Sequence, residues 1–462
     1  MTTKRKPIRT VLLVLLGVVV PILGAELFAG SGLPNPLTTL DPTGTLGTFS
    51  SSGPIDIANP FFQKLGTNGR TCNSCHVSTQ GWTVSPPEIQ QRFIITAGTD
   101  PIFRPVDGSN CPSADVSTTE ARLSAYSLLL KKGLIRISLP VPAGADFQIT
   151  DIEDPYHCPQ TTTTQPAMYR RPLPATNLPF LTTVMWDGRE SPKGQSLTAD
   201  LTQQAIDATT GHAQGAPPSQ QQLRQIVAFE TALFTAQSFD FAAGKLTAEG
   251  ATGGPVSLST QNFYVGINDA LGGDPTGAAF NPDAFTTFSA WANLSGPSAK
   301  SARESVARGE ALFNSFPITI TGVAGLNDLP GLSTVNGTCT TCHDTPNVGN
   351  HSVPLAINIG VTDYPARGGL DISGLPVYTI TCRSTGGTVQ TTDPARALIT
   401  GKCADVGKTK GPILRGLAAR APYFHNGSAA DLSAVIEFYD QRFSLNLTDQ
   451  QKADLVAFLQ TL

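Results

Sequence analysis

Apolar residues recur with the spacing of one helix face in several separate stretches of the chain. The pattern is clearest at the C-terminal end, where a Thr-x-x-Gln capping box begins at Thr448 and apolar residues follow from Leu455 at i, i+3, i+4 and i+7. By the same criteria we expect further helices over 119–132, over 197–208, after Ser219, around 306–313 and over 432–439. No long stretch alternates apolar and polar residues, and short strands are expected only around Val377–Cys382. The pattern therefore predicts a mainly α fold.

The segments between the expected helices are rich in Gly, Pro, Ser and Thr, which predicts long irregular loop insertions. The longest of these loops are expected over 95–165 and 345–410. A Gly/Pro/Ser-rich stretch near 290–300 marks a boundary between two halves. We therefore expect an extended linker over 26–60, an N-terminal domain over 61–295 and a C-terminal domain over 296–462.

The N-terminus carries basic residues followed by an apolar run over 11–23. This order is typical of a secretory signal or an uncleaved membrane anchor, and residues 1–25 are assigned to one of these two. Export would place the protein in the periplasm or another extracytoplasmic space. The formal net charge is −4 and the basic residues form no stripe, which gives a nucleic-acid partner no support. Membrane contact is expected only through an N-terminal anchor.

Two Cys-x-x-Cys-His motifs occur in the chain, over 72–76 and over 339–343. Two thiols at this spacing add to the two vinyl groups of one haem, and the adjacent histidine reaches the iron from the proximal side. A zinc site would need further paired ligands at short spacing, and none flanks either motif. The motifs predict two covalently bound haem c groups, with His76 and His343 as proximal iron ligands. The thiols expected to hold the haems are Cys72, Cys75, Cys339 and Cys342.

Four further cysteines remain, and an even remainder in an exported chain predicts disulfides. Their order along the chain favours the pairs Cys111–Cys158 and Cys382–Cys403, each of which closes a loop inside one half.

A distant internal repeat follows the two haem motifs. Met185-Trp186-Asp187-Gly188-Arg189 comes after the first motif, and Phe424-His425-Asn426-Gly427-Ser428 comes after the second. Each is a short turn sequence that leads toward an expected helix. The repeat predicts two related cytochrome c-type halves.

With these motifs in this order, the sequence resembles the di-haem bacterial cytochrome c peroxidases and their MauG-like relatives. The resemblance rests on the two haem motifs, on the turn at 186–189, and on Leu414-Arg415 followed by the segment 421–428. It implies that the N-terminal haem reacts with hydrogen peroxide, while the C-terminal haem stores and relays an electron. It also implies that Trp186 lies between the haems as an electron bridge. The loops at 95–165 and 345–410 are not explained by it.

In the peroxidases, the distal ligand of the second haem is a methionine. It stands fourteen residues after the histidine of the turn, which is His425 in this chain. The chain has three methionines, all before the second haem motif, and Tyr439 stands at that position. MauG-like enzymes place a tyrosine ligand there, so the resemblance favours Tyr439, with His425 as the alternative and His351 as a further rival. From the residues alone, the pattern favours a core tyrosine bonded to a carbonyl or a haem propionate.

On the distal side of the first haem, the family uses a glutamine and, ten residues on, a glutamate. Gln204 continues the face of Leu197 and Leu201, but no glutamate follows, and His212 is the nearby group able to move a proton near neutral pH. The resemblance thus implies catalytic roles for His212, Gln204 and Trp186. His212 could instead ligate the iron permanently. The family's calcium site is doubtful here, because Arg420 and Arg170-Arg171 stand near its ligand positions.

The hypothesis from the sequence is an exported, peroxide-dependent di-haem oxidoreductase of the peroxidase type. Its partners would be hydrogen peroxide and either a small cytochrome or other electron-donor protein, or a protein substrate. The alternative is a non-enzymatic di-haem electron carrier, and an oxygenase on the same scaffold is a third hypothesis.

Overall fold

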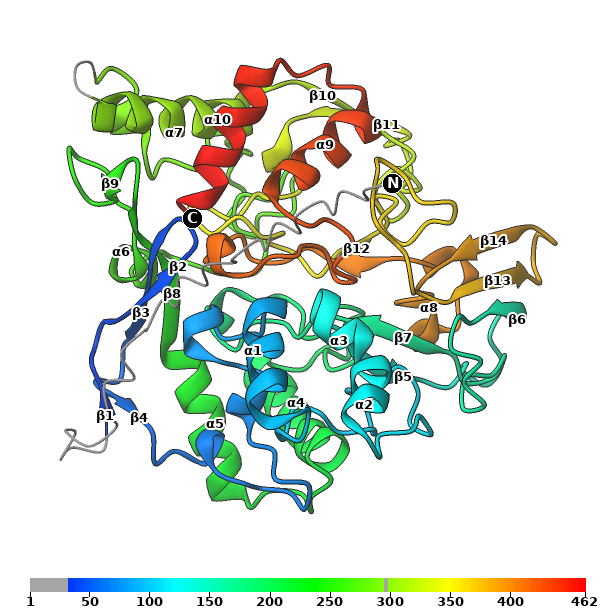
Figure 1. Cartoon of the computed structure of the whole chain (residues 1–462). Helices are drawn as coiled ribbons and strands as arrows, with labels where there is room; N and C mark the ends of the chain where they lie inside the picture. Colours follow the sequence, from blue (N-terminus) through cyan, green and yellow to red (C-terminus); the bar gives the residue numbers. More distant parts are fainter. Residues whose placement is uncertain (1–31, 295–297) are drawn as a thin grey trace, which may run out of the picture.

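The computed structural model of the protein describes residues 32–294 and 298–462 (Figure 1). The expected signal or anchor over 1–25 lies outside these residues. Within them, the longest helix is α7 (Ser298–Ser315), and no helix combines the length and apolar character needed to cross a membrane. In Figure 1, α1–α5 occupy the lower part of the molecule, and α7, α9 and α10 occupy the upper part.

The helices of the N-terminal half begin and end where capping predicts. The Ser219 capping box starts α5, and the helix expected over 119–132 is present but divided at Tyr126 into α2 and α3. It ends at Gly133, whose φ of 65° is a left-handed conformation that favours glycine. The α-helices of this half are α1 (Pro86–Thr96), α2 (Thr119–Ala125), α3 (Ser127–Lys132), α4 (Leu197–Asp207), α5 (Gln220–Ala232) and α6 (Pro255–Ser259).

The C-terminal half is built on α7, α9 (Leu432–Phe443) and α10 (Asp449–Gln460). The short helix α8 (Ala397–Thr400) lies between α7 and α9 along the chain. α10 packs closely on α7: a Cβ at Gly309 would lie 2.0 Å from the carbonyl oxygen of Asp454. A cluster of buried aromatic rings fills the space below these helices. Its members are Phe285, Phe288, Trp291, Phe313 and Phe458.

This cluster extends across the expected domain boundary. Phe285, Phe288 and Trp291 were assigned to the N-terminal domain, yet they pack against α7 and α10 together with Ala243 and Leu246. Their large apolar side chains belong to the nearest core that can bury them, and that core is formed by the C-terminal helices.

Strands are more numerous than the sequence pattern predicted, so the expectation of a mainly α fold is not confirmed. The four-stranded sheet has the order β2-β3-β8-β9, made of Leu37–Asp41, Gly44–Ser50, Leu233–Asp240 and Gly244–Lys245. Part of the expected linker over 26–60 is therefore a hairpin of β2 and β3. Along its whole length, β3 also pairs with the distant β8. The Thr48 and Thr235 hydroxyls meet at 3.0 Å in this pairing.

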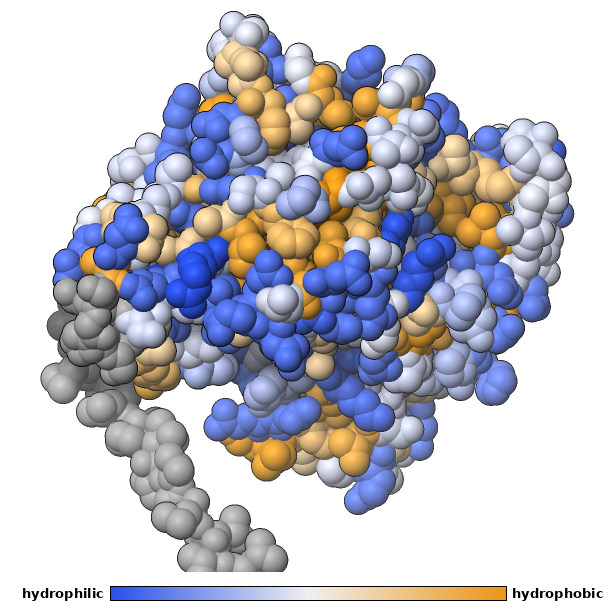
Figure 2. Space-filling model, turned by 90° about the horizontal axis from the view of Figure 1, so that it is seen from above, coloured by the Kyte–Doolittle hydropathy of each residue, from blue (hydrophilic) through white to orange (hydrophobic). Residues whose placement is uncertain are grey.

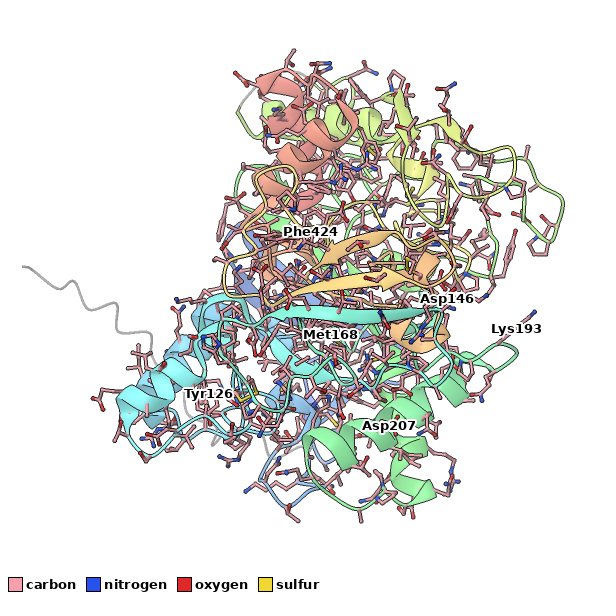
Figure 3. The ribbon with its side chains drawn as sticks, turned by 90° about the vertical axis from the view of Figure 1, so that its right-hand side faces the viewer. Tyr126, Asp146, Met168, Lys193, Asp207 and Phe424 are labelled. Atoms are coloured by element: carbon pink, nitrogen blue, oxygen red, sulfur yellow. A yellow bond between two sulfur atoms is a disulfide. The ribbon has the colours of Figure 1, made fainter. Side chains whose placement is uncertain are left out.

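The two long loops expected over 95–165 and 345–410 meet in a three-stranded sheet of order β14-β13-β6 (Figure 3). The strands are β6 (Phe147–Glu153), β13 (Val377–Cys382) and β14 (Thr388–Thr391). Both expected disulfides, Cys111–Cys158 and Cys382–Cys403, are present in these segments. The former loops thus form one layer across the two halves, and the strand expected at Val377–Cys382 is confirmed.

The remaining strands are short and pair two by two. They are β1 (Gly32–Leu33) with β4 (Ile55–Asp56), β5 (Ile135–Ser138) with β7 (Ala167–Arg170), β10 (Ile318–Thr321) with β11 (Thr334–Gly337), and β12 (Ala356–Ile357) with β15 (Thr409–Lys410). Seen from above, the surface is mainly polar, with apolar residues gathered near the centre of the face (Figure 2).

Candidate cofactor and active sites

The first Cys-x-x-Cys-His motif lies on the wall of a large cavity. Thr71 and Ser74 cap a single turn of 3₁₀ helix over Cys72–Ser74, and His76 follows at its end. Cys72, Cys75 and His76 all line this cavity, which is here called the N-cavity. Its empty volume, including the open solvent at its entrance, is about 1620 Å³. The His76 Nδ1 lies 3.1 Å from the carbonyl oxygen of Trp82, so Nε2 is the nitrogen left for a ligand.

The second motif repeats this construction. Thr338 and Thr341 cap the turn Cys339–Thr341, and the motif lines a second cavity, the C-cavity, of about 1860 Å³. The His343 Nδ1 lies 2.9 Å from the carbonyl oxygen of Gly349. Trp82 and Gly349 both stand six residues after their histidines, and both have left-handed backbone, with φ of 59° and 77°.

The ionisation of these side chains suits the expected roles. Burial lowers the pKa of His76 to about 4 and also lowers that of His343, so both rings are neutral and able to ligate a metal. Burial raises the pKa of Cys72, Cys339 and Cys342 to about 12. The four motif cysteines form no disulfide among the described residues, and they are not activated thiolates of the redox type.

Buried cations between the cavities provide a test of whether haem fits. Arg171, Lys410 and Arg420 line both cavities, and none has a carboxylate within ion-pair distance in the described part of the chain. Burial lowers their pKa values to about 9, 7 and 10. The Arg420 Nε also has no hydrogen-bond partner. Unpaired buried cations are costly, and a haem with two propionates at each cavity would supply the missing anions. The residues therefore fit the cofactor.

Trp186 lies where the two cavities adjoin and lines both. Its Nε1 donates to the carbonyl of Arg171 at 2.8 Å, and its ring meets that of His425 edge-on at 6.0 Å between centroids. The following Asp187 is buried and accepts hydrogen bonds from Arg170 and Arg189, which pins the turn. The structure thus brings Trp186 to the wall that separates the two haem motifs.

The turns at 185–188 and 424–427 share their backbone conformation as well as their sequence pattern. Met185 and Phe424 have φ of 66° and 65°, and Gly188 and Gly427, three residues on, have φ of 73° and 64°. A left-handed conformation is uncommon for residues other than glycine, so its recurrence at matching positions supports an internal repeat.

At the wall of the N-cavity, α4 ends in a π turn over Ala208–His212. Gln204 and His212 both line the cavity, as expected from the sequence. The His212 Nδ1 contacts the carboxylate of Asp107, which is also bound by the Arg70 guanidinium at 2.6 Å. Burial opposes ionisation of Asp107, but the bonds from His212 and Arg70 outweigh it and hold its pKa below the usual value.

Two residues of this pocket were missed by the sequence analysis. Asp107 lies in the loop that the resemblance did not explain, and no local pattern marks it. Glu230 lines the same cavity, and burial raises its pKa to about 8. Its Oε2 has no hydrogen-bond partner among the described residues. A sequence pattern could have identified Glu230. It lies seven residues after Leu223, on the apolar helix face of Leu223, Ile226 and Val227, and a glutamate is rarely buried on such a face.

Much of the wall of the C-cavity is aromatic and apolar. Tyr439 lines it and stacks on Phe443 at 6.2 Å between centroids. Burial raises the pKa of Tyr439 above its usual value, and its hydroxyl has no hydrogen-bond partner in the described ranges. His425 also lines the cavity, but its Nε2 lies 3.5 Å from a carboxylate oxygen of Asp393. His351 is nearby and faces Asp344.

Arg171 stands where the resemblance suggested a calcium site. Its guanidinium donates to the carbonyls of Lys132, Val84 and Arg420, at 2.9, 2.7 and 3.2 Å. The bond to Arg420 connects the N-terminal half with the C-terminal half.

Comparison with known proteins gives partial matches. The chain is 30% identical over 144 residues to the cytochrome-c peroxidase IdrP1 of Denitromonas iodatirespirans, covering 27% of this chain and 36% of the relative. It is 32% identical over 145 residues to IdrP2 of the same organism, covering 28% and 37%. IdrP1 of Pseudomonas sp. (strain SCT) matches at 39% over 69 residues, covering 13% and 18%. The chain thus matches less than half the length of these relatives, and no family model matches it.

Among solved structures, a MauG-like protein associated with microbial copper homeostasis aligns over 93% of this chain and 94% of its own, at 16% identity and a TM-score of 0.38. A Kuenenia stuttgartiensis hydrazine synthase aligns over 82% and 93%, at 14% identity and a TM-score of 0.32. At these TM-scores the likeness carries no argument about this chain.

Proposed function

We propose that this chain, a relative of the cytochrome c peroxidases, is an exported di-haem oxidoreductase that reacts with hydrogen peroxide. The observation that carries the proposal is the pair of cavities on either side of Trp186, each with a Cys-x-x-Cys-His motif on its wall. Cys72 and Cys75 would hold one haem, and Cys339 and Cys342 the other. When bound, haem supplies a redox-active iron that can take peroxide where its sixth position is open.

The N-cavity is the proposed peroxide site because its distal side carries a proton carrier. His212 presents Nε2 to the cavity, since Nδ1 is engaged by Asp107. From there Nε2 can take the proton of one peroxide oxygen and return it to the oxygen that leaves as water. Asp107 keeps the proton of the neutral ring on Nδ1 and stabilises the imidazolium between these two transfers. Gln204 is proposed to orient peroxide by hydrogen bonding.

The C-cavity is the proposed electron-transfer site. An iron with two protein ligands is usually an electron carrier, and Tyr439 is the proposed second ligand beside His343. Tyr439 lines the cavity, and the resemblance to MauG-like enzymes favours it. The alternative, His425, also lines the cavity, and its Nε2 has no hydrogen-bond partner among the described residues. Trp186 is proposed to pass electrons between the two sites. The electrons come from a small cytochrome, another donor protein or a protein substrate in the periplasm.

The alternative function, a non-enzymatic electron carrier, has one observation in its favour. His212 is held through Nδ1 in the same manner as His76 and His343, and this is how a ligating imidazole is oriented. In that case His212 would occupy the sixth position of the first iron.

A steady-state assay separates these functions. Holoprotein is mixed with hydrogen peroxide and a reduced small cytochrome c, and oxidation of the cytochrome is followed in step with loss of peroxide. The enzyme should consume one peroxide for two oxidised cytochromes. If peroxide is not consumed and the first haem neither binds nor responds to it, the carrier function holds instead.

A further inference from the structure

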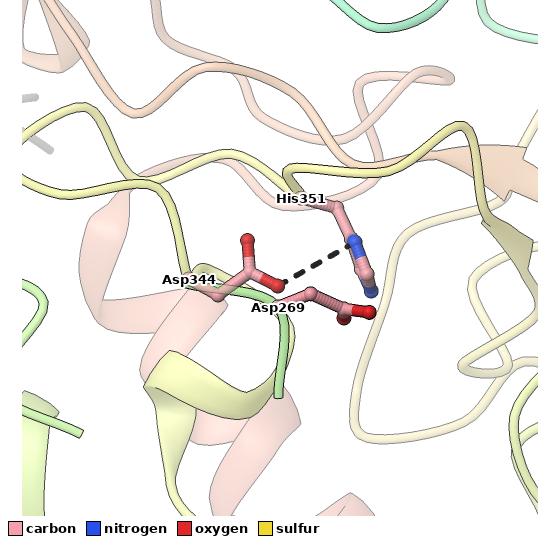
Figure 4. A group of neighbouring side chains, drawn as sticks. All are labelled: Asp269, Asp344 and His351. Carbon is pink, nitrogen blue, oxygen red and sulfur yellow. Dashed lines mark ion pairs between the residues drawn. The ribbon is translucent and has the colours of Figure 1, made fainter. Parts of the chain in front are cut away.

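Beside the second haem attachment site, three buried ligand-type side chains converge, and one of them, His351, also lines the C-cavity. Asp269, Asp344 and His351 are 4%, 0% and 5% exposed. Each offers one oxygen or nitrogen atom, and these atoms all lie within 4.8 Å of one another. The side chains point toward one common space from two stretches of chain, the segment after the second haem motif and the loop that contains Asp269 (Figure 4).

The charges in this cluster are unbalanced. Neither carboxylate has a lysine or arginine within ion-pair distance in the described residues, and the contact between Asp344 Oδ2 and His351 Nδ1 is 3.6 Å long. That distance is too long for a hydrogen bond, and Oδ2 has no other partner. A buried carboxylate oxygen without a donor or a cation is strongly unfavourable.

The same carboxylates are held in place by the backbone. Asp344 Oδ1 accepts from the Ser352 amide at 2.7 Å, which leaves Oδ2 directed at the cluster. Asp269 accepts from the amides of Leu271 and Gly273 at 3.1 and 2.8 Å. A Cβ at Gly273 would lie 2.4 Å from Asp269 Oδ2, so the backbone approaches the carboxylate closely at this glycine. Such outer hydrogen bonds are typical of metal-binding carboxylates.

We propose that Asp269, Asp344 and His351 bind one divalent transition-series metal ion of the Zn²⁺ type. An imidazole with two carboxylates is a ligand set that suits such ions, and three protein ligands leave room for water. Calcium would require six to eight oxygens, and magnesium avoids imidazole. The ion would fasten the segment after the second haem motif to the loop that contains Asp269. This inference does not depend on the peroxidase proposal.

The test uses holoprotein, because its motif thiols are bonded to haem and cannot bind zinc. The protein is stripped with a chelator, dialysed against Zn²⁺ and analysed for metal, with haem measured separately so that haem iron is subtracted. We expect about one Zn²⁺ per chain and a rise in Tm when Zn²⁺ is added. Asp269→Asn and His351→Asn should each abolish both effects. Asp283→Asn removes an exposed carboxylate of a neighbouring segment and serves as the matched control.

Two results would overturn the proposal. One is a wild-type holoprotein that takes up no Zn²⁺ and shows no change in Tm. The other is uptake that the two cluster variants leave unchanged, since the ion would then lie elsewhere. The wild-type titration decides the question even if a variant fails to fold.

Discussion

The N-cavity and the C-cavity share one half of their construction and differ in the other. Both present a capped turn with two cysteines and a neutral histidine whose Nδ1 is bound to a carbonyl six residues later. The remaining lining of the N-cavity includes Gln204, His212 and the carboxylate of Asp107, whereas that of the C-cavity includes Tyr439 among apolar residues. Under the proposed function, this difference separates a site that moves protons from a site whose iron has two protein ligands.

The largest expected effect is that of His212→Ala in the N-cavity. Loss of the proton carrier should lower the turnover of peroxide by about 10²- to 10⁴-fold, the usual contribution of one general acid–base group. The assay with reduced cytochrome c measures it, and the haem content must equal that of the wild type. Unchanged turnover would mean that the N-cavity does not use His212.

Asp107→Asn tests whether the carboxylate positions His212. The amide oxygen can accept a hydrogen bond from Nδ1–H, but it carries no charge to stabilise an imidazolium. Turnover should therefore fall by about 10- to 100-fold. Equal haem content and equal Tm in the variant and the wild type would show that the fall comes from the lost positioning of His212 and not from misfolding. A variant with the wild-type rate would show that Asp107 is only structural.

Glu230 should make stability depend on pH. Its folded pKa of about 8 lies above the ordinary glutamate value of about 4.3, so the folded state holds a proton that the unfolded state has lost. The contribution of Glu230 to the free energy of unfolding is therefore fully present below about pH 4. It is lost as pH rises through about 8, by a few kcal/mol in total. Glu230→Gln should remove this loss.

The measurement is Tm against pH for the wild type and Glu230→Gln. The two should converge at low pH and separate by pH 8, with the variant more stable. Parallel curves would show that Glu230 ionises without cost.

The smallest effect on turnover is expected for Tyr439→Phe in the C-cavity. The variant removes the proposed ligand but no proton carrier, so turnover should change by less than about tenfold. The reduction potential of the second haem should rise, because phenolate favours ferric iron. An unchanged potential would favour His425 as the ligand.

The sequence predicted those parts of the molecule that depend on local spacing. The haem motifs, the capped helices α5 and α10 and both disulfides follow from residues close together in the chain or from simple pairing. The hairpin of β2 and β3 was missed because its partner strand β8 lies far along the chain, with Thr48 and Thr235 187 positions apart. The many short strands also leave the predicted mainly α class unconfirmed.

The same limit applies to the candidate sites. His212 and Gln204 could be identified through the family resemblance, but Asp107 is 105 positions from His212, and no motif connects them. The cluster of Asp269, Asp344 and His351 is likewise assembled from separate loops. Glu230 differs, because its place on the apolar face of α5 was visible in the sequence.

Low-temperature EPR of the resting ferric holoprotein, with and without a small excess of hydrogen peroxide, tests the contrast between the cavities most directly. An open first iron and a closed second iron predict one high-spin and one low-spin signal, both lost when peroxide is added. Two low-spin signals that do not respond to peroxide, even after partial reduction, would contradict the account and leave an electron carrier.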